Sequence, residues 1–375
     1  MDDLPVEIKE MIIYYCDGES LFNLQQINQH WKILVDKEDE RRNLFKSRLK
    51  SDIEKNTLKD VITKLYPKKN YLYSNPDLYK FVFYATLRWK YFNNSCFKIK
   101  KLPHKFSVII DLKTSGNTIL VGDKCGLYVI KSLNDPLIFF GIGRVKNIEL
   151  FCTSSKATSI DHEYDEVDVM TENNVHHFFN LQKNTFYKKT RFRENKCIKY
   201  WMGKSIELDM KKSNRDPVLK ADFYENFVMM VTEKNVIQSK SSSLSKVRKT
   251  PFNSHGWRVW FLWHSKLVIC AKDDSLEIFC DGATTTIDYH LFPPVSAIFY
   301  HAGWLFLGSR YGILYGYQLH FDEILSLDLH KHQIRLQICD KAIVKVDVIE
   351  NKTLSLVVAS DEELFLIRCD AKKTK

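Results

Sequence analysis

The sequence predicts a multidomain α+β protein, in which a helical N-terminal part precedes an all-β body built from repeated hairpins. In the first 90 residues or so, apolar residues recur every three or four positions, which is the helix period. From about Lys105 this spacing disappears, and short β-rich runs alternate with Gly, Asn, Asp and Ser. We expect a helical unit at 1–49, a helical linker at 50–104 and the β-rich body at 105–371.

The composition is typical of a folded protein with a reduced interior. Hydrophobic residues make up 45% of the 375 residues and aromatic residues 13%, which is ample for a packed core. No run of eighteen apolar residues occurs and the start is acidic and helical, so we expect no membrane contact and no secretory leader. The nine cysteines include no CxxC pair. Reduced thiols in the cytoplasm or nucleus are therefore favoured over disulfides or zinc.

Residues 4–49 predict three short helices. The apolar residues of this stretch fall in three blocks at helical spacing, namely Ile8, Met11, Ile12 and Tyr15, then Leu21, Leu24 and Ile27, then Trp31, Leu34 and Val35. Leu4-Pro5 suits a helix start, because proline lacks only an amide that would be unpaired there. Asp17-Gly18 ends the first helix, and Ser20 is expected to cap the second. A unit this small buries too little surface to be stable alone, so we expect it to dock on a partner.

The residue pattern of this unit resembles an F-box. The matching positions are Leu4-Pro5-x-Glu7-Ile8, Ile12, Asp17, Ser20-Leu21, Leu24, Ile27-Asn28, Trp31 and Leu34-Val35. The sequence departs from the family at Glu40-Arg41, where an aromatic residue is common. The resemblance implies an apolar anchor that binds a Skp-type adaptor and, through it, a cullin–RING ligase. The anchor residues would be Leu4, Pro5, Ile8, Ile12, Leu21, Leu24, Ile27, Trp31, Leu34 and Val35. A generic helical cap on another domain is the alternative.

Two further apolar segments predict a helical linker. The first runs from Ile53 to Leu65 and stops before Pro67, and the second runs from Leu78 to Trp89. In proteins that pair an F-box with WD repeats, a helical linker ends in a Trp-containing stretch just before the propeller. Trp89 stands where that resemblance places it.

The β-rich body repeats one pattern, in which a short apolar run and a small residue precede a polar turn and an alternating strand. The clearest copy is 304–317, and others centre on Gly122, Thr171, Thr232, Ala271 and Ala359. With a degenerate copy at 198–208, the spacing is about 40 residues, the period of WD-type blades. We expect a propeller of seven blades, with six as the alternative and a large sandwich as the competing fold. The resemblance to WD repeats is degenerate, because the chain contains no Gly-His or Trp-Asp dipeptide.

The sequence offers little for catalysis. No GxSxG, HExxH, Walker A or GxGxxG pattern occurs, so we expect neither an enzyme nor a cofactor. His176 and His177 are neighbours on a predicted strand and point to opposite faces, so they cannot easily share a metal ion. We expect both at the surface and no metal site.

One basic segment is the better candidate for binding. Residues 183–220 hold twelve basic residues against four acidic ones, a net charge of +8. Arginine side chains bind phosphate and carboxylate in two-pronged geometry, so basic loops between strands could hold an acidic or phosphorylated target protein. The candidates are Lys188, Lys189, Arg191, Arg193, Lys211, Lys212, Arg215 and Arg248. Solvated loops are the alternative explanation, and nucleic acid ranks third because no binding module is recognised.

Together these observations favour the substrate-recognition subunit of a Skp–cullin–F-box type ubiquitin ligase. A non-catalytic propeller scaffold with no role in ubiquitination is the alternative.

Overall fold

The computed structural model describes most of the chain between residues 4 and 371. The described residues are 4–52, 55–65, 77–132, 135–151, 166–173, 175–181, 183–191, 196–201, 204–209, 218–224, 227–239, 247–253, 257–262, 267–280, 282–319, 321–350 and 354–371.

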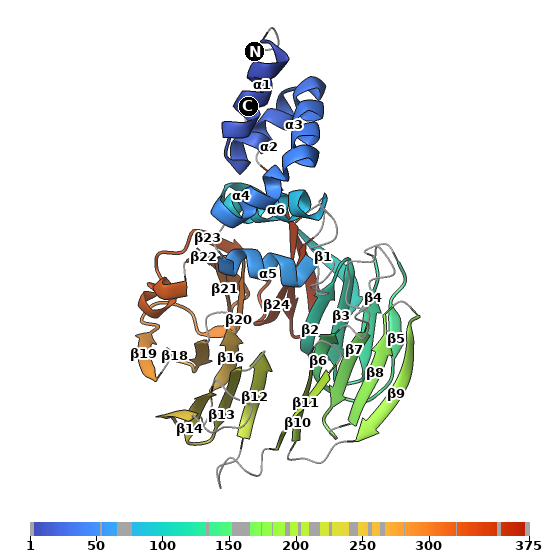
Figure 1. Cartoon of the computed structure of the whole chain (residues 1–375). Coiled ribbons are helices and arrows are strands. Elements are labelled where there is room, and N and C mark those ends of the chain that lie inside the picture. Colours follow the sequence, from blue (N-terminus) through green and yellow to red (C-terminus); the bar gives the residue numbers. More distant parts are fainter. Residues whose placement is uncertain are drawn as a thin grey trace.

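Helices form the N-terminal part, and Figure 1 shows them stacked on one side of the β-rich body. The described helices are α1 (Val6–Tyr15), α2 (Gly18–Ile27), α3 (Gln29–Arg42), α4 (Leu44–Asp52), α5 (Lys55–Leu65), α6 (Asp77–Lys90) and the short 3₁₀ helices η2 (Phe92–Asn94) and η4 (Phe321–Ser326).

Side-chain caps set the helix boundaries. The Asp17 carboxylate accepts a 2.7 Å hydrogen bond from the Ser20 amide and caps α2. The cap is thus Asp17, three residues before the Ser20 that the sequence suggested, because a carboxylate is an equally good acceptor for the free amides of a first turn. Asn28 caps α3 in the same way, accepting from the Trp31 amide at 3.0 Å. Asn43 ends α3 in the left-handed conformation, with φ of 50°.

Six four-stranded antiparallel sheets form the blades of a propeller. In chain order of their strands, they are β2–β5 (Ile109–Ser115, Thr118–Asp123, Leu127–Ile130, Ile138–Phe140), β6–β9 (Val145–Phe151, Glu166–Thr171, Val175–Asn180, Thr185–Arg191), β12–β15 (Val218–Tyr224, Phe227–Thr232, Asn235–Ser239, Val247–Pro251), β16–β19 (Arg258–Leu262, Leu267–Ala271, Ser275–Cys280, Ala283–Asp288), β20–β23 (Val295–His301, Trp304–Ser309, Ile313–Gln318, Ile334–Gln337) and β24–β26 (Ile343–Glu350, Leu354–Ser360, Glu363–Ala371) with β1 (Ser95–Lys105). The predicted propeller is confirmed.

The expectation of seven blades is wrong, and the alternative of six holds. At 198–208, where the sequence suggested a degenerate blade, there is a two-stranded sheet of β10 (Lys196–Trp201) and β11 (Lys204–Asp209). The spacing argument counted this hairpin as a blade because one apolar run, a turn and a second run are present. A blade needs two more strands, which the described residues do not provide.

The last blade joins the two ends of the β-rich body. Strand β1 pairs along its length with β26, from Ser95 opposite Ala371 to Lys105 opposite Glu363. The end of the segment that we expected to be linker therefore belongs to a blade, and the β-rich body begins at Ser95. This pairing closes the ring, because β1 supplies the outer strand of a sheet whose other strands come from the C-terminal end.

Turn and inter-blade hydrogen bonds replace the missing Gly-His and Trp-Asp ties. Several second strands end in a side chain that closes the following turn, such as Ser309, which accepts from the amides of Tyr311 and Ile313 at 3.3 and 3.1 Å. Between blades, Asp347 accepts from the Thr114 amide at 2.7 Å. Buried carboxylates that accept backbone amides lose little by leaving water, so they can tie neighbouring blades together.

Candidate interaction surfaces

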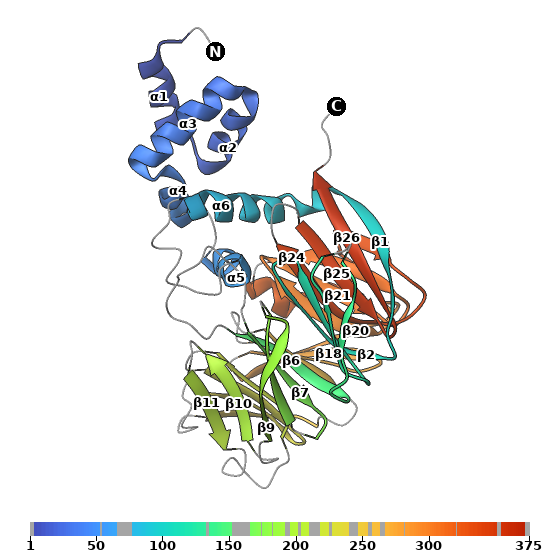
Figure 2. The same ribbon diagram turned by 90° about the vertical axis from the view of Figure 1, so that its right-hand side faces the viewer.

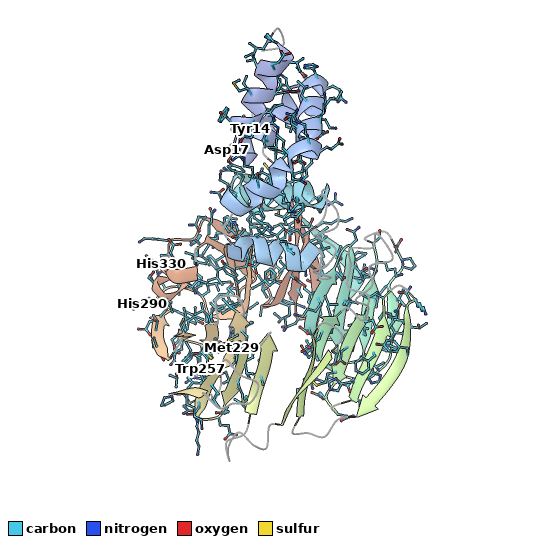
Figure 3. All side chains as sticks on the ribbon, in the orientation of Figure 1. Tyr14, Asp17, Met229, Trp257, His290 and His330 are labelled. Carbon is cyan, nitrogen blue, oxygen red and sulfur yellow. The ribbon has the colours of Figure 1, made fainter. Side chains whose placement is uncertain are left out.

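The outer surface of α1 is an apolar face that the rest of the chain leaves uncovered. Five large apolar residues of this helix are exposed, with Tyr15 at 75% and Met11 at 55% of their full accessibility. They are Val6, Ile8, Met11, Tyr14 and Tyr15, and we call them the α1 face. Figure 3 shows Tyr14 on the helical part, far from the blades that carry His290 and His330. Glu7 is exposed on the same helix, and the Arg42 guanidinium lies 4.9 Å from the Tyr14 ring. Exposed apolar surface rimmed by charged residues is typical of a protein-binding site.

The ten expected adaptor contacts divide into two groups. Pro5, Ile8 and Ile27 are exposed and Leu4 and Ile12 are half-buried. The other five are buried in the chain's own core: Leu21, Leu24, Trp31, Leu34 and Val35. These five hold the helices together and are not available to a partner, because helical periodicity alone does not say which apolar side chains face inward. Met11 and Tyr15 were expected on the first helix, but not among the adaptor contacts.

The helices are fixed to the propeller by a buried polar network at Trp89. The Trp89 indole donates to one carboxylate oxygen of Glu350, and His301 Nε2 lies 2.9 Å from the other. The Trp304 indole in turn donates to the Trp89 carbonyl at 2.8 Å. Trp89 is 1% exposed. The tryptophan thus lies at the junction that the sequence suggested, and it joins α6 to β20, β21 and β24.

Helix α5 makes a second set of bonds across the ends of the inner strands. Lys64 reaches Asp347 at 2.8 Å and the Thr114 carbonyl at 3.0 Å. Asp60 accepts from the Ala302 amide at 3.0 Å. Strands β2, β20 and β24 are all contacted, so α5 covers the end of the ring at which these strands finish. The opposite end, where the inner strands begin, lies on the side away from the helices (Figure 2).

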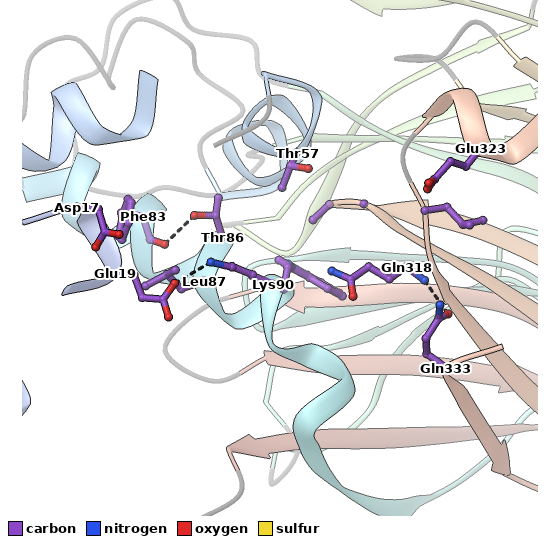
Figure 4. Close-up of a pocket in the computed structure, with 14 residues that line it drawn as sticks. Asp17, Glu19, Thr57, Phe83, Thr86, Leu87, Lys90, Gln318, Glu323 and Gln333 are labelled. Atoms are coloured by element: carbon purple, nitrogen blue, oxygen red, sulfur yellow. Dashed lines mark hydrogen bonds and ion pairs between the residues drawn. The ribbon is translucent and has the colours of Figure 1, made fainter. Parts of the chain in front are cut away.

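A cleft of about 520 Å³ lies between the helices and blade β20–β23 (Figure 4). Phe83 and Leu87 contribute apolar surface, and Gln318 and Gln333 line the propeller side. At its helical wall, Glu19 accepts a hydrogen bond from Lys90 at 2.7 Å. The bonds from Lys90 and Tyr91 lower the pKa of Glu19, since they favour the ionised carboxylate.

The structure corrects the expected positions of the basic residues. Lys188, Lys189 and Arg191 belong to β9 and Arg248 belongs to β15, so they lie on the outer strands of their blades rather than in connecting loops. Arg193, Lys211, Lys212 and Arg215 fall outside the described residues. The basic stretch has the sequence pattern of a loop because lysine and arginine interrupt the apolar residues, but an outer strand carries such residues without cost.

A different set of cations meets at the open end of the ring. Lys220, Arg258, Arg310 and Lys345 line a cavity of about 550 Å³, together with Asp361. We call these four residues the basic mouth. Three of them occupy equivalent positions near the start of β12, β16 and β24, opposite Val231, Ala271 and Ala359 of the second strands. This repeat was visible in the sequence only after alignment of the blades, which is why the charge count missed it.

The four cations of the basic mouth differ in how far they are neutralised. Lys345 lies 2.9 Å from Asp111, and Arg310 forms an ion pair with Asp273. Burial raises the pKa of Asp111, but Lys345 and the other hydrogen bonds of this carboxylate outweigh burial, so the pKa is lowered. Lys220 donates to the Val259 carbonyl at 2.7 Å, and Arg258 is exposed. The mouth therefore keeps an excess of positive charge.

The histidines expected at the surface are buried instead. His176 and His177 are 6% and 8% exposed on β8, and His176 Nδ1 lies 2.8 Å from Asp168. Burial between blades is possible because the ring nitrogen of His176 has a carboxylate partner. In the described part of the chain, no three His, Cys, Asp or Glu side chains are placed to hold a metal ion. Among the described helices, none has the length and apolar character needed to cross a membrane.

Comparison with known proteins identifies the fold. No protein-family model matches the chain, and no curated protein matches its sequence. Among solved structures, a chain from the crystal structure of a mitotic checkpoint complex matches 73% of this chain and 91% of its own length, with 13% identity and a TM-score of 0.51. At this identity the likeness shows the fold alone, a WD-type β-propeller.

Proposed function

We propose that this chain is the substrate-recognition subunit of a Skp–cullin–F-box type ubiquitin ligase. In this proposal the helical unit at 1–49 docks on a Skp-type adaptor, the linker fixes the distance, and the propeller holds the target protein. The chain itself carries no catalytic residue and accelerates ubiquitin transfer by proximity. The observation that supports the docking role is the exposed α1 face, which belongs to the unit whose residues resemble an F-box.

The α1 face has the exposed apolar side chains that are typical of a protein-binding interface. Burying apolar surface stabilises an association by about 25 cal/mol for each Å² removed from water, and five large side chains on one helix are exposed here. The buried residues behind them, such as Trp31 and Val35 at 0% exposure, keep the helix in place without a partner. The proposed adaptor contact therefore shifts from these core residues to the exposed ones.

Retrieval of a Skp-type adaptor by the purified full chain tests the proposal. The double variant Met11→Asp, Tyr15→Asp places two charges on the α1 face, and we expect it to reduce adaptor retrieval at least tenfold. The matched control is Leu291→Asp, Tyr311→Asp, which changes two propeller residues that are 95% and 62% exposed. Both variants should keep the unfolding temperature of the wild type. If the wild type retrieves no adaptor, or if the two variants retrieve it equally, the adaptor role is wrong.

For the target site, the proposal moves from the expected outer-strand residues to the basic mouth. Clustered cations favour a ligand with carboxylates or phosphates, and the mouth lies at the end of the ring that α5 leaves open. We expect Lys220→Glu with Arg258→Glu to abolish binding of an acidic or phosphorylated peptide to the propeller. Binding should weaken with salt, since surface charges are screened over about 10 Å at 0.1 M. Lys100→Glu, on the outer strand β1, is the matched control.

A propeller scaffold without a role in ubiquitination is the second candidate. The fold likeness to a chain of a multi-protein complex favours it. It predicts that target proteins are retrieved whether or not the α1 face carries charges, and that no adaptor or cullin accompanies them. Mass spectrometry of the retrieved proteins separates the two. In either role we propose a location in the cytoplasm or nucleus, which fits the free thiols of the described cysteines.

A further inference from the structure

The connection between β19 and β20 displays one apolar side chain at the end of the ring that carries the basic mouth. Leu291, in this connection, is 95% exposed. The connection leads into Val295, the first residue of the inner strand β20, and the basic mouth lies where the inner strands begin. Helix α5 contacts the other end of β20, at Ala302. The exposed leucine therefore lies on the same side of the propeller as the basic mouth.

The turn that carries Leu291 is held firmly on both sides. Its neighbours Tyr289 and Phe292 are 3% and 6% exposed, and the ring centres of Phe292 and Tyr315 lie 4.5 Å apart. The Phe292 amide donates to the Tyr289 carbonyl at 2.7 Å. His290 has a φ of 47°, in the left-handed region that residues other than glycine rarely adopt. Backbone strain of this kind is concentrated at binding sites, so the turn is a candidate for one.

A second exposed side chain belongs to the adjoining turn between β21 and β22. Tyr311, in this turn, is 62% exposed. The amide of its neighbour Arg310 donates to the Pro294 carbonyl at 3.0 Å, which joins the two connections. The Gln337 side chain donates to the Tyr311 carbonyl at 2.9 Å and also fixes the turn. We call Leu291 and Tyr311 the apolar rim.

Two cations of the basic mouth lie next to the apolar rim. Arg310 immediately precedes Tyr311, and its Nε is buried without a hydrogen-bond acceptor. Burial raises the pKa of Tyr289. The Val295 amide and the positive charges of Arg258 and Arg310 partly offset this rise, so both guanidiniums lie within electrostatic reach of the turn. Exposed apolar surface and an excess of positive charge therefore adjoin on one face of the propeller.

We propose that the target segment binds at two adjoining places, with a carboxylate or phosphate in the basic mouth and an apolar side chain on the apolar rim. This inference rests on the proposed role of the basic mouth and narrows the target to an extended segment that carries both kinds of side chain. The anionic group speeds the encounter. Burial of the apolar side chain then adds affinity that an acidic segment without one lacks.

A pair of peptides tests the proposal on the full chain. The probe is a fluorescein-labelled peptide with four central aspartates and a leucine–phenylalanine pair at each end, joined by glycine–serine spacers. The apolar pair stands at both ends so that either chain direction can bind. The reference peptide has serine in place of each leucine and phenylalanine. We expect the wild type to bind the probe at least about tenfold more tightly than the reference peptide, and both to weaken with salt.

A thermodynamic cycle assigns this difference to the apolar rim. Leu291→Ser with Tyr311→Ser should bind both peptides equally, at the wild-type affinity for the reference peptide, because it removes apolar surface without changing charge. Ile99→Ser is the matched control, since Ile99 is 42% exposed on the outer strand β1, and it should keep the tenfold preference. The altered side chains are all exposed, so the unfolding temperature should stay at the wild-type value. Lys220→Glu with Arg258→Glu should abolish binding of both peptides.

The possible results separate this inference from the proposed function. Equal binding of the two peptides by the wild type would overturn the role of the apolar rim and leave the basic mouth as the target site. A tenfold preference that survives in the rim double variant would do the same. If the wild type binds neither peptide, the basic mouth does not take acidic segments, and both proposals for the target site are wrong. Adaptor retrieval depends on the α1 face, so its result bears on the ligase role alone.

Discussion

Replacing Trp89 by phenylalanine should destabilise the junction between the helices and the propeller more than the loss of side-chain volume alone suggests. Trp89→Phe keeps an aromatic ring against Phe92 and His301, whose ring centres each lie 5.1 Å away. It removes the indole N–H that Glu350 accepts. The carboxylate then keeps its contact with His301 and the nearby charge of Arg88 in a site that is 4% exposed.

The expected loss in the free energy of unfolding has two contributions. Leaving a buried acceptor without its donor costs about 1–3 kcal/mol, and more when the acceptor is charged. The smaller ring leaves a cavity that adds about 1 kcal/mol. We therefore expect Trp89→Phe to lower the free energy of unfolding by about 2–4 kcal/mol. This is a large part of the roughly 5–15 kcal/mol that stabilises a typical domain.

Urea unfolding of the full chain, followed by circular dichroism, measures this loss. Trp257→Phe is the matched control, because Trp257 is half-buried against Phe252, and its loss should stay below about 1 kcal/mol. A double-mutant cycle with Glu350→Leu, which removes the acceptor, isolates the hydrogen bond, with an expected coupling of about 1 kcal/mol or more. If the two changes are additive within about 0.5 kcal/mol, the bond does not hold the junction and the reasoning fails.

Three further outcomes are expected. The folded pKa of Asp111 lies below its ordinary value of 3.8, so this carboxylate stabilises the fold above that pH. The stabilisation is lost as the pH falls through the folded pKa. Urea unfolding in acid should therefore show a smaller loss of stability with falling pH for Asp111→Asn than for the wild type. A side chain at Gly308 would meet Ile343 at 2.6 Å, so Gly308→Val should cost at least about 2 kcal/mol in the same assay, and an unchanged midpoint would contradict the close packing. A chain that ends at Ser360 lacks β26 and leaves β1 unpaired, so we expect it to lose stability. If its far-ultraviolet spectrum and unfolding temperature stay near those of the wild type, ring closure is dispensable.

The sequence was most informative where structure is local. The hairpin of Trp304–Ser309 and Ile313–Gln318 follows from apolar runs and the turn between them, and it is found as expected. The propeller follows from the repetition of such hairpins. The first three helices of 4–49 likewise follow from spacing alone, whereas the fourth, α4 at Leu44–Asp52, was not expected. In each case, neighbouring residues carry the whole signal.

What depends on distant contacts was predicted poorly. Burial of Trp31 and Leu34 depends on how α3 packs against α1, α2 and α4, which spacing within α3 cannot report. Strand β1 was expected to be linker because its partner, β26, lies at the other end of the described chain. The basic mouth is assembled from separate blades, so its residues are scattered in the sequence. A local sequence pattern shows which residues are charged, whereas the basic mouth depends on which strand ends lie together in space.

The pairing of β1 with β26 also determines the order in which parts of the protein can fold during synthesis. On the ribosome the strand at Ser95–Lys105 emerges long before Glu363–Ala371, the partner it needs. Closing such a distant pair carries a large loop-entropy cost and slows folding. Helices α1 to α4 pack on one another and on α6, all of which emerge early, so this part can fold first. During synthesis, a nascent chain therefore presents a finished α1 face beside an open ring with an unpaired edge, a state that invites chaperone binding.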